Sequence, residues 1–136
     1  MSEISGFYGD NRWLSNLAPI SIKMDGLLFH SVENAFNAAR TYERYWPEYQ
    51  RVTSGQSKAL SRQHPPRVGW AHERIAVMKG LLRQKFADKY YREKLKATGD
   101  SKLIHTNTWD DTLWGVCNGK GSNLLGQLLM ELRDTL

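Results

Sequence analysis

The stretch from His30 to Arg40, with the sequence HSVENAFNAAR, constrains the fold most, because its apolar residues recur with the period of an α-helix. Ser31 is the expected N-cap, since its hydroxyl can accept a hydrogen bond from an amide of the first turn. The pattern predicts a helix that begins after Ser31 and ends at about Tyr45, because Pro47 restricts the residue before it. The apolar stripe of this helix would consist of Val32, Ala35, Phe36 and Ala39.

Three polar side chains lie along one edge of this predicted helix. Glu33, Asn37 and Arg40 follow one another at positions i, i+4 and i+7. Glu33 also falls in the first turn, where the helix dipole favours a carboxylate. Glu33 could therefore line a pocket at the border of the apolar stripe, or it could be a solvated residue that only stabilises the helix start.

A β-hairpin is expected just before this helix. Ile20, Ile22 and Met24 alternate with polar residues, which is the period of a strand. Asp25-Gly26 favours a tight type I′ turn, after which residues 27–30 would return as the second strand. A hairpin this small is only marginally stable alone, so it must pack on the helices that follow.

The rest of the chain predicts helices joined by short connections. The longest, over residues 70–86, would bury Ile75, Met78, Leu82 and Phe86. Nothing divides the 136 residues, so we expect one domain, 1–136, of the α+β class, predominantly α-helical, with a small N-terminal β-hairpin. The other expected elements are helices at 48–54 (stopped by Gly55), 57–63, 90–98 (stopped by Gly99) and from Ser122 or Asn123 onward, and a strand or extended segment at 102–107.

The charge of the chain is unevenly distributed. The net charge is +5, but residues 40–96 hold 14 lysine or arginine residues against 5 acidic ones, which gives that segment +9. Such a segment favours an anionic partner such as a nucleotide or nucleic acid. Helices with a solubilising surface would show the same charge, so both interpretations stay open.

Other features exclude several classes of protein and site. The single cysteine, Cys117, rules out an internal disulfide framework and a multi-cysteine metal site. The four histidines lack metal-ligand spacing, so no metal and no cofactor is expected. Without a signal-peptide pattern or a long apolar run, the sequence predicts a soluble, cytoplasmic protein with no membrane partner.

Three loop segments carry candidate binding residues. Residues 7–19 include Arg12 and Asn16, which could contact a ligand, although the loop could equally serve to plug the core. Residues 119–123, Gly-Lys-Gly-Ser-Asn, precede a helix and could hold an anion, or they could be a plain glycine-rich connection. Asp111 and Trp114 could place a carboxylate and a stacking ring in one pocket, or Asp111 could cap a turn with Trp114 in the core.

Several short motifs follow one another in a fixed order, and together they resemble the YbiA-like or NADAR family, whose name refers to NAD and ADP-ribose. The resemblance extends from Phe7 to Arg133. The chain departs from the family pattern at Asn34, Asn37, His105 and Cys117. The matching motifs are Tyr8-Gly9, Leu14-Ser15-Asn16, Gly26, Phe29, Ser31, Glu33, Trp70, Lys85-Phe86, Thr98-Gly99-Asp100, Asp111-x-x-Trp114-Gly115, Gly121-x-Asn123-x-Leu125-Gly126 and Leu129-Met130-x-x-Arg133.

The resemblance implies a mostly helical fold and a hydrolase that cleaves an N-glycosidic bond without a metal. Glu33 would be the principal catalytic carboxylate and Asp111 a second one, acting as an acid or a ribose ligand. The implied binding residues are Trp114 with Gly115, or Trp70, for the base; Lys120 with Gly121 and Asn123, or Lys85, for phosphate; and Arg12 and Asn16 to close the site.

The implied substrate contains ADP-ribose or a ribosyl phosphate, and three functions are compatible with it. The first is removal of ADP-ribose from ADP-ribosylated guanine in DNA or RNA, which the basic segment favours. The second is cleavage of a ribosylamino-pyrimidine phosphate intermediate of riboflavin biosynthesis. The third is a non-catalytic module that binds ADP-ribose or NAD.

Overall fold

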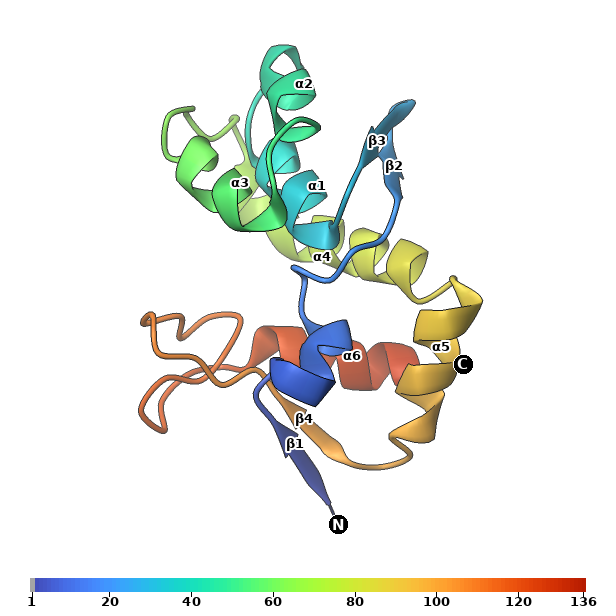
Figure 1. The fold of residues 1–136 in the computed structure, drawn as a ribbon. Helices are drawn as coiled ribbons and strands as arrows, with labels where there is room; N and C mark the ends of the chain where they lie inside the picture. Colours follow the sequence, from blue (N-terminus) through green and yellow to red (C-terminus); the bar gives the residue numbers. More distant parts are fainter. Residues whose placement is uncertain (1) are drawn as a thin grey trace. The chain divides into compact units, whose positions relative to one another are not determined.

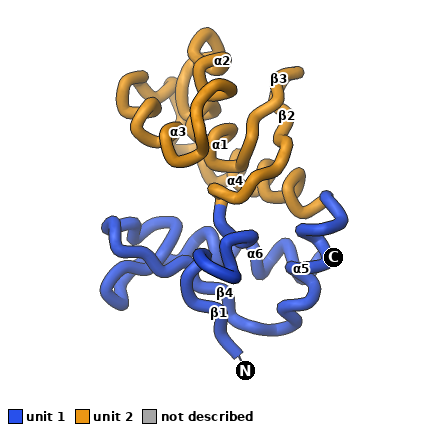
Figure 2. Tube along the Cα trace, viewed as in Figure 1, with its two compact units in different colours: residues 1–15, 88–136 blue, residues 16–87 orange. Residues whose placement is uncertain are grey.

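The computed structural model describes residues 2–136 as short strands and helices (Figure 1). They form two compact units (Figure 2): the central unit, residues 16–87, and the terminal unit, residues 1–15 with 88–136. No helix among residues 2–136 is both long and apolar enough to span a membrane. The elements in chain order are β1 (Glu3–Ser5), η1 (Gly9–Leu14), β2 (Ile22–Met24), β3 (Leu27–Phe29), α1 (Val32–Arg40), η2 (Glu43–Tyr45), α2 (Trp46–Tyr49), α3 (Ser54–Ser61), α4 (Trp70–Lys85), α5 (Lys89–Ala97), β4 (Lys102–Ile104) and α6 (Leu124–Arg133).

The predicted hairpin of the central unit is confirmed. Strands β2 and β3 pair antiparallel, with Ile22 opposite Phe29. Asp25 and Gly26 both have positive φ angles, 47° and 84°, as a type I′ turn requires. Ile22 and Phe29 are buried, whereas Lys23 is exposed, so one face of the hairpin packs inward.

The start of helix α1 is confirmed and its predicted end is wrong. The Ser31 hydroxyl accepts a hydrogen bond from the Asn34 amide at 3.0 Å, as expected of an N-cap. The helix ends at Arg40 instead of Tyr45, because Thr41 has extended backbone angles. Two hydrogen bonds hold Thr41 in this extended conformation. Its hydroxyl donates to the Pro65 carbonyl, and its own carbonyl accepts from the Trp46 indole.

The two short helices predicted after α1 have different boundaries. Pro47 lies in the first turn of α2 and so begins a helix, where the prediction used it as a stop. Gly55 lies inside α3, because Thr53 and Gln56 form a capping box that starts the helix just before it. The helix predicted at 48–54 is therefore wrong, and the one predicted at 57–63 begins three residues earlier, at Ser54.

Helix α4 confirms the prediction for residues 70–86 to within one residue. Met78, Leu82 and Phe86 are buried as expected, but Ile75 is 40% exposed and is not part of the core. The helix packs against α1 and β2. Gln84 strengthens the contact with β2, because its side-chain amide both accepts from the Lys23 amide and donates to the Lys23 carbonyl.

The terminal unit contains a pairing that the sequence did not predict. Strand β1 pairs in parallel with β4, with Ile4 opposite Leu103. The pairing joins segments about a hundred residues apart. The three residues of β1 include one apolar side chain, so they show no alternating pattern from which a strand could be predicted. The predicted loop at 7–19 contains the 3-10 helix η1, and Phe7 is buried.

Helices α5 and α6 agree with their predictions. Asp88 caps α5 by accepting hydrogen bonds from the Tyr90 and Tyr91 amides. Gly99 follows with a φ angle of 61°, the left-handed conformation expected after a helix. Helix α6 begins after Asn123 and packs on β4. Leu125, Leu128 and Leu129 of α6 are buried, whereas Leu124 and Leu132 are half-buried.

Helix α6 approaches β4 closely because of two residues. The side chain of Asn123 accepts from the His105 amide and donates to the Leu103 carbonyl, each at 2.9 Å, so it bridges the strand. A Cβ atom added to Gly126 would collide with the Leu103 carbonyl oxygen. The matched family motif at these positions therefore has a structural basis in the helix–strand contact.

Candidate active site

Glu33 is half-buried in the first turn of α1 and has an ordered partner. Its Oε2 accepts a hydrogen bond from Asn37 Nδ2 at 3.3 Å, and the same amide donates to Ser57 Oγ at 2.9 Å. Asn37 and Ser57 are buried. The Glu33 backbone amide donates to the Asn16 carbonyl. The carboxylate is thus held by an amide that is itself fixed.

The orientation of the Asn37 amide follows from the hydrogen bonds of Ser57. The Ser57 hydroxyl donates to the Ser54 carbonyl at 2.9 Å, so it can only accept from Asn37. The Asn37 group that faces both Ser57 and Glu33 must therefore be the NH2 group. Arg40, predicted on the same edge, instead donates to the Ser61 and His64 carbonyls.

Lys85, at the end of α4, has no exposed surface. Burial lowers the pKa of its amine from 10.5 to about 7, because a charged group is poorly solvated inside a protein. Its Nζ lies 5.1 Å from the centroid of the Phe86 ring. A phosphate bound beside the amine would favour its charged form, so the phosphate contact of Lys85 stays a prediction.

Two other predicted binding residues lie in the central unit. Trp70 is almost entirely buried, with its ring centroid 5.1 Å from that of Phe36 and the Arg67 guanidinium 5.2 Å from its ring. Asn16 donates from Nδ2 to the Met78 sulfur, at 3.7 Å. Its Oδ1 is buried and accepts no hydrogen bond from residues 2–136. Asn16 therefore keeps an acceptor available, whereas Trp70 has little face left for stacking.

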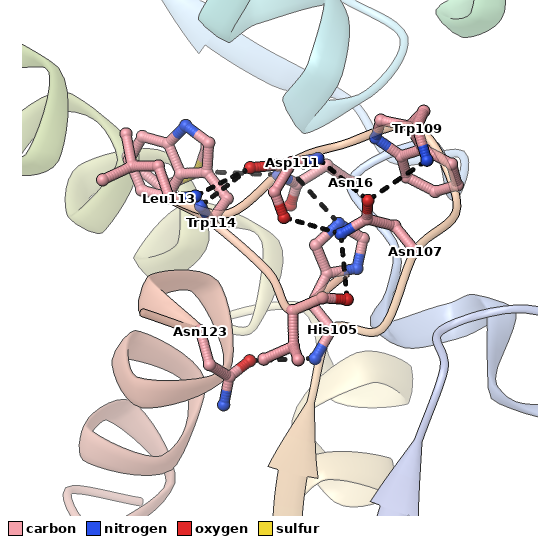
Figure 3. Close-up of polar contacts among 10 residues, drawn as sticks. Asn16, His105, Asn107, Trp109, Asp111, Leu113, Trp114 and Asn123 are labelled. Carbon is pink, nitrogen blue, oxygen red and sulfur yellow. Dashed lines mark hydrogen bonds and ion pairs between the residues drawn. The ribbon is translucent and has the colours of Figure 1, made fainter. Parts of the chain in front are cut away.

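Asp111 lies in the terminal unit at the centre of a turn (Figure 3). Its Oδ1 accepts from the Leu113 and Trp114 amides, at 3.2 and 3.0 Å, which is the turn-capping geometry that the sequence left open as an alternative. Its Oδ2 lies 4.0 Å from His105 Nε2. One carboxylate oxygen is thus committed to the turn and the other faces a histidine. Trp114 is half-buried.

Sequence reasoning missed the residue that organises this turn, Asn107. Its Oδ1 accepts from the Trp109 and Asp111 amides, and its Nδ2 donates to the Asp111 carbonyl at 2.8 Å (Figure 3). An asparagine four residues before an aspartate in a loop without periodicity was the available signal. His105, which packs between the rings of Phe7 and Trp109, was noted only as a departure from the family pattern.

Hydrogen bonds within the predicted phosphate site at 119–123 leave fewer of its backbone amides available to an anion. The Ser122 and Asn123 amides donate to the Thr112 and Gly115 carbonyls, so these two amides are not available to an anion. A Cβ atom at Gly121 would collide with the Gly115 carbonyl, and one at Gly115 with the His105 carbonyl. Because they have no side chain, both glycines allow the backbone segments next to them to approach closely. The prediction of a phosphate site therefore rests on Lys120, which is exposed, and Gly121.

The predicted site residues are divided between the two compact units. Among residues 2–136, no three histidine, cysteine or acidic side chains are arranged to hold a metal ion. The central unit holds Asn16, Glu33, Trp70 and Lys85, and the terminal unit holds Arg12, Asp111, Trp114, Gly115, Lys120, Gly121 and Asn123.

Comparison with known proteins gives relatives along nearly the whole chain. N-glycosidase YbiA of Shigella boydii is 40% identical over 135 residues, covering 95% of this chain and 82% of the relative. YbiA of Escherichia coli is 39% identical over the same length. A riboflavin biosynthesis protein of Vibrio vulnificus is 31% identical over 133 residues, and the match covers 36% of that protein.

A solved structure gives the same result for the fold. The NMR structure of E. coli YbiA superposes with a TM-score of 0.85 at 34% identity, and covers 98% of this chain and 84% of that one. This likeness confirms the α+β, mainly helical fold class. The NADAR domain matches residues 4–136. With the family's motifs in register, this match shows that the chain belongs to the NADAR family.

Proposed function

We propose that this chain hydrolyses the bond between C1 of a ribose and a nitrogen of a base, with Glu33 as the principal catalytic carboxylate. Relatives 40% identical to it are named N-glycosidases, so the chain is an enzyme of that class. As the bond breaks, positive charge builds on the sugar. A fixed carboxylate stabilises that charge, water adds its oxygen to C1, and the base leaves with a proton.

The observation that carries the proposal is the arrangement of Glu33, Asn37 and Ser57. The hydroxyl of Ser57 fixes the amide of Asn37, and that amide holds one oxygen of Glu33. Because the amide is already oriented, the carboxylate needs little reorganisation when the sugar becomes cationic. The carboxylate held in this way would then stabilise the sugar cation or orient the attacking water.

We propose proton transfer by Lys85 as an alternative to the phosphate contact predicted from the sequence. Its pKa of about 7 gives comparable amounts of amine and ammonium at neutral pH. A group with such a pKa can protonate the departing base and can accept a proton from water. Lys85 lies on α4, which packs against the helix that carries Glu33. Asp111, as an acid or ribose ligand, stays a prediction from the resemblance.

For the substrate we propose ADP-ribosylated guanine in nucleic acid. The support is the charge of residues 40–96, since a net +9 suits a polyanion better than one small phosphate ester. The second candidate is a ribosylamino-pyrimidine phosphate, which is favoured by the name of the V. vulnificus relative, a riboflavin biosynthesis protein. Either substrate presents the same ribose–nitrogen bond to Glu33.

The test is a comparison of product release from the two substrates. Purified protein is incubated with an oligonucleotide that carries ADP-ribose on guanine, and separately with the ribosylamino-pyrimidine phosphate, and the products are measured by mass spectrometry. We expect free ADP-ribose from the first. We expect Glu33→Gln to lower kcat by roughly a hundredfold or more, since amide and carboxylate have the same shape but only the carboxylate stabilises the cation.

The matched control is Glu43→Gln, which removes the charge of an exposed glutamate in η2 and should leave kcat unchanged. Turnover of only the pyrimidine substrate would replace the nucleic-acid substrate with the second candidate. If ADP-ribose binds in a calorimeter but the wild type forms no product from either substrate, the chain is a binding module and the assignment of Glu33 is wrong.

A further inference from the structure

A cluster of aromatic and basic side chains lies on α5 and η1, both within the terminal unit. The ammonium group of Lys94 lies 5.4 Å from the centroid of the Trp13 ring and 5.5 Å from that of Tyr90. It therefore lies close to the two rings, which come from segments about 75 residues apart. Tyr90 is 62% exposed, although a large aromatic side chain usually finds cover in a folded protein.

A buried neighbour fixes the position of the exposed ring. Tyr91 is buried, and its ring meets that of Tyr90 edge to face, at 5.2 Å and 84°. Burial raises the pKa of the Tyr91 phenol, and the nearby Arg12 guanidinium opposes this shift. Arg12 thus adds a second, exposed cation to the cluster. Trp13, Tyr90, Lys94 and Arg12 are called the aromatic platform below.

The charge of α5 matches a polyanion. The helix carries Lys89, Arg92, Lys94 and Lys96 against a single acidic residue, Glu93. Its large apolar residues other than Tyr90, namely Tyr91 and Leu95, are buried. The helix therefore has no apolar face with which to enter a lipid surface, whereas an exposed ring beside cations suits a ligand that has both flat rings and phosphates.

We propose that the aromatic platform binds a short segment of single-stranded nucleic acid, with bases stacked on Tyr90 and Trp13 and phosphates on Lys94 and Arg12. Base faces stack on aromatic rings whatever their sequence, and lysine and arginine track the backbone. The inference rests on the proposed function and deepens it: unmodified nucleotides of the strand that carries the ADP-ribosylated guanine are held here. Sequence preference is expected to be weak.

Binding of unmodified strands tests the platform without any catalytic step. A fluorescein-labelled 12-nucleotide DNA of mixed sequence, and an RNA of the same sequence, are titrated with the full chain while anisotropy is recorded. We expect Tyr90→Ala to weaken binding about tenfold and Tyr90→Phe, which keeps the ring, to stay within twofold of wild type. Tyr90 is exposed, so both variants should fold, which thermal melting verifies.

Lys94→Ala tests the phosphate contact by a different measurement. The slope of log K against log salt concentration should fall in magnitude by about 0.7, the value for one phosphate contact on a single strand. Lys23→Ala is the matched control, because it removes an exposed lysine of β2 that lies outside residues 40–96 and should leave affinity and slope nearly unchanged.

Three results would overturn the platform: no binding by the wild type at low salt, wild-type affinity in both Tyr90→Ala and Lys94→Ala, or equal competition by polyglutamate, which has charge without rings. These outcomes are separable from failure of the proposed function. Hydrolysis of ADP-ribosylated guanosine as a free nucleoside needs no strand. If it proceeds while strands do not bind, only the platform is wrong; if strands bind and no substrate is cleaved, only the function is wrong.

Discussion

Lys85 is the residue whose chemistry the fold changes most, and the change predicts how stability depends on pH. Above pH 10.5 this lysine is neutral in both the folded and the unfolded chain. Between pH 10.5 and 7 the unfolded chain binds a proton that the folded chain does not. As the pH falls through this range, the free energy of unfolding therefore decreases by about 1.4 kcal/mol for each pH unit. Below about pH 7 the cost stays constant.

Lys85→Met should therefore be more stable than wild type at pH 7, with an advantage that shrinks towards pH 10. The measurement is the difference in free energy of unfolding between the two proteins, by urea titration at three pH values. Lys58→Met, at an exposed site, should give a difference that does not change with pH. A pH-independent advantage of Lys85→Met would show that the amine keeps its ordinary pKa in the folded protein.

Asp111 allows its structural and chemical contributions to be separated by two substitutions. Asp111→Asn keeps an oxygen that can accept from the Leu113 and Trp114 amides, so stability should change by less than about 1 kcal/mol. Asp111→Ala removes both hydrogen bonds and should cost about 1–2 kcal/mol. If Asp111→Asn melts like wild type but loses kcat, the carboxylate acts in catalysis; unchanged kcat would leave it a turn residue alone.

At the scale of elements, α6 and α4 offer a comparison of two helical glycines. Gly126→Ala should destabilise by more than about 2 kcal/mol, because the new methyl group meets the Leu103 carbonyl and forces α6 away from β4. Gly80→Ala, in α4, meets no atom within 4 Å and should stabilise by up to about 1 kcal/mol through helix propensity. Thermal unfolding of both variants gives the two signs, and equal signs would contradict the close approach of α6 and β4.

The elements also show which parts of the fold a sequence can predict. The helix start at Ser31 and the turn at Asp25-Gly26 depend on neighbouring residues, so local chemistry identifies them. The end of α1 depends on the bond of Thr41 to Pro65, and β1 depends on its pairing with β4. These are long-range contacts with no local pattern, so the sequence did not predict them.

At the scale of the whole molecule, the two compact units differ in charge. The central unit holds 11 lysine or arginine residues against 5 acidic ones, and the terminal unit holds 8 against 9. The motifs identified the candidate residues in both units, because each motif is a short local pattern. They left Asp111 open between a turn and a pocket and did not show that the Lys85 amine is buried, since hydrogen-bond partners and burial arise only when the chain folds.

The charge of the whole chain predicts how catalysis responds to salt. If the substrate is a nucleic acid strand held by about three phosphate contacts, its KM should rise roughly twentyfold between 50 and 200 mM salt, because each contact contributes about −0.7 to the logarithmic slope. A ribosylamino-pyrimidine phosphate has one phosphate group and should show only a modest change. The measurement is initial rate against substrate concentration at four salt concentrations, with kcat as the internal control, since bound substrate has already displaced its counterions. A salt-insensitive KM for the oligonucleotide would mean that the basic segment is a solubilising surface and that only the modified nucleotide is recognised.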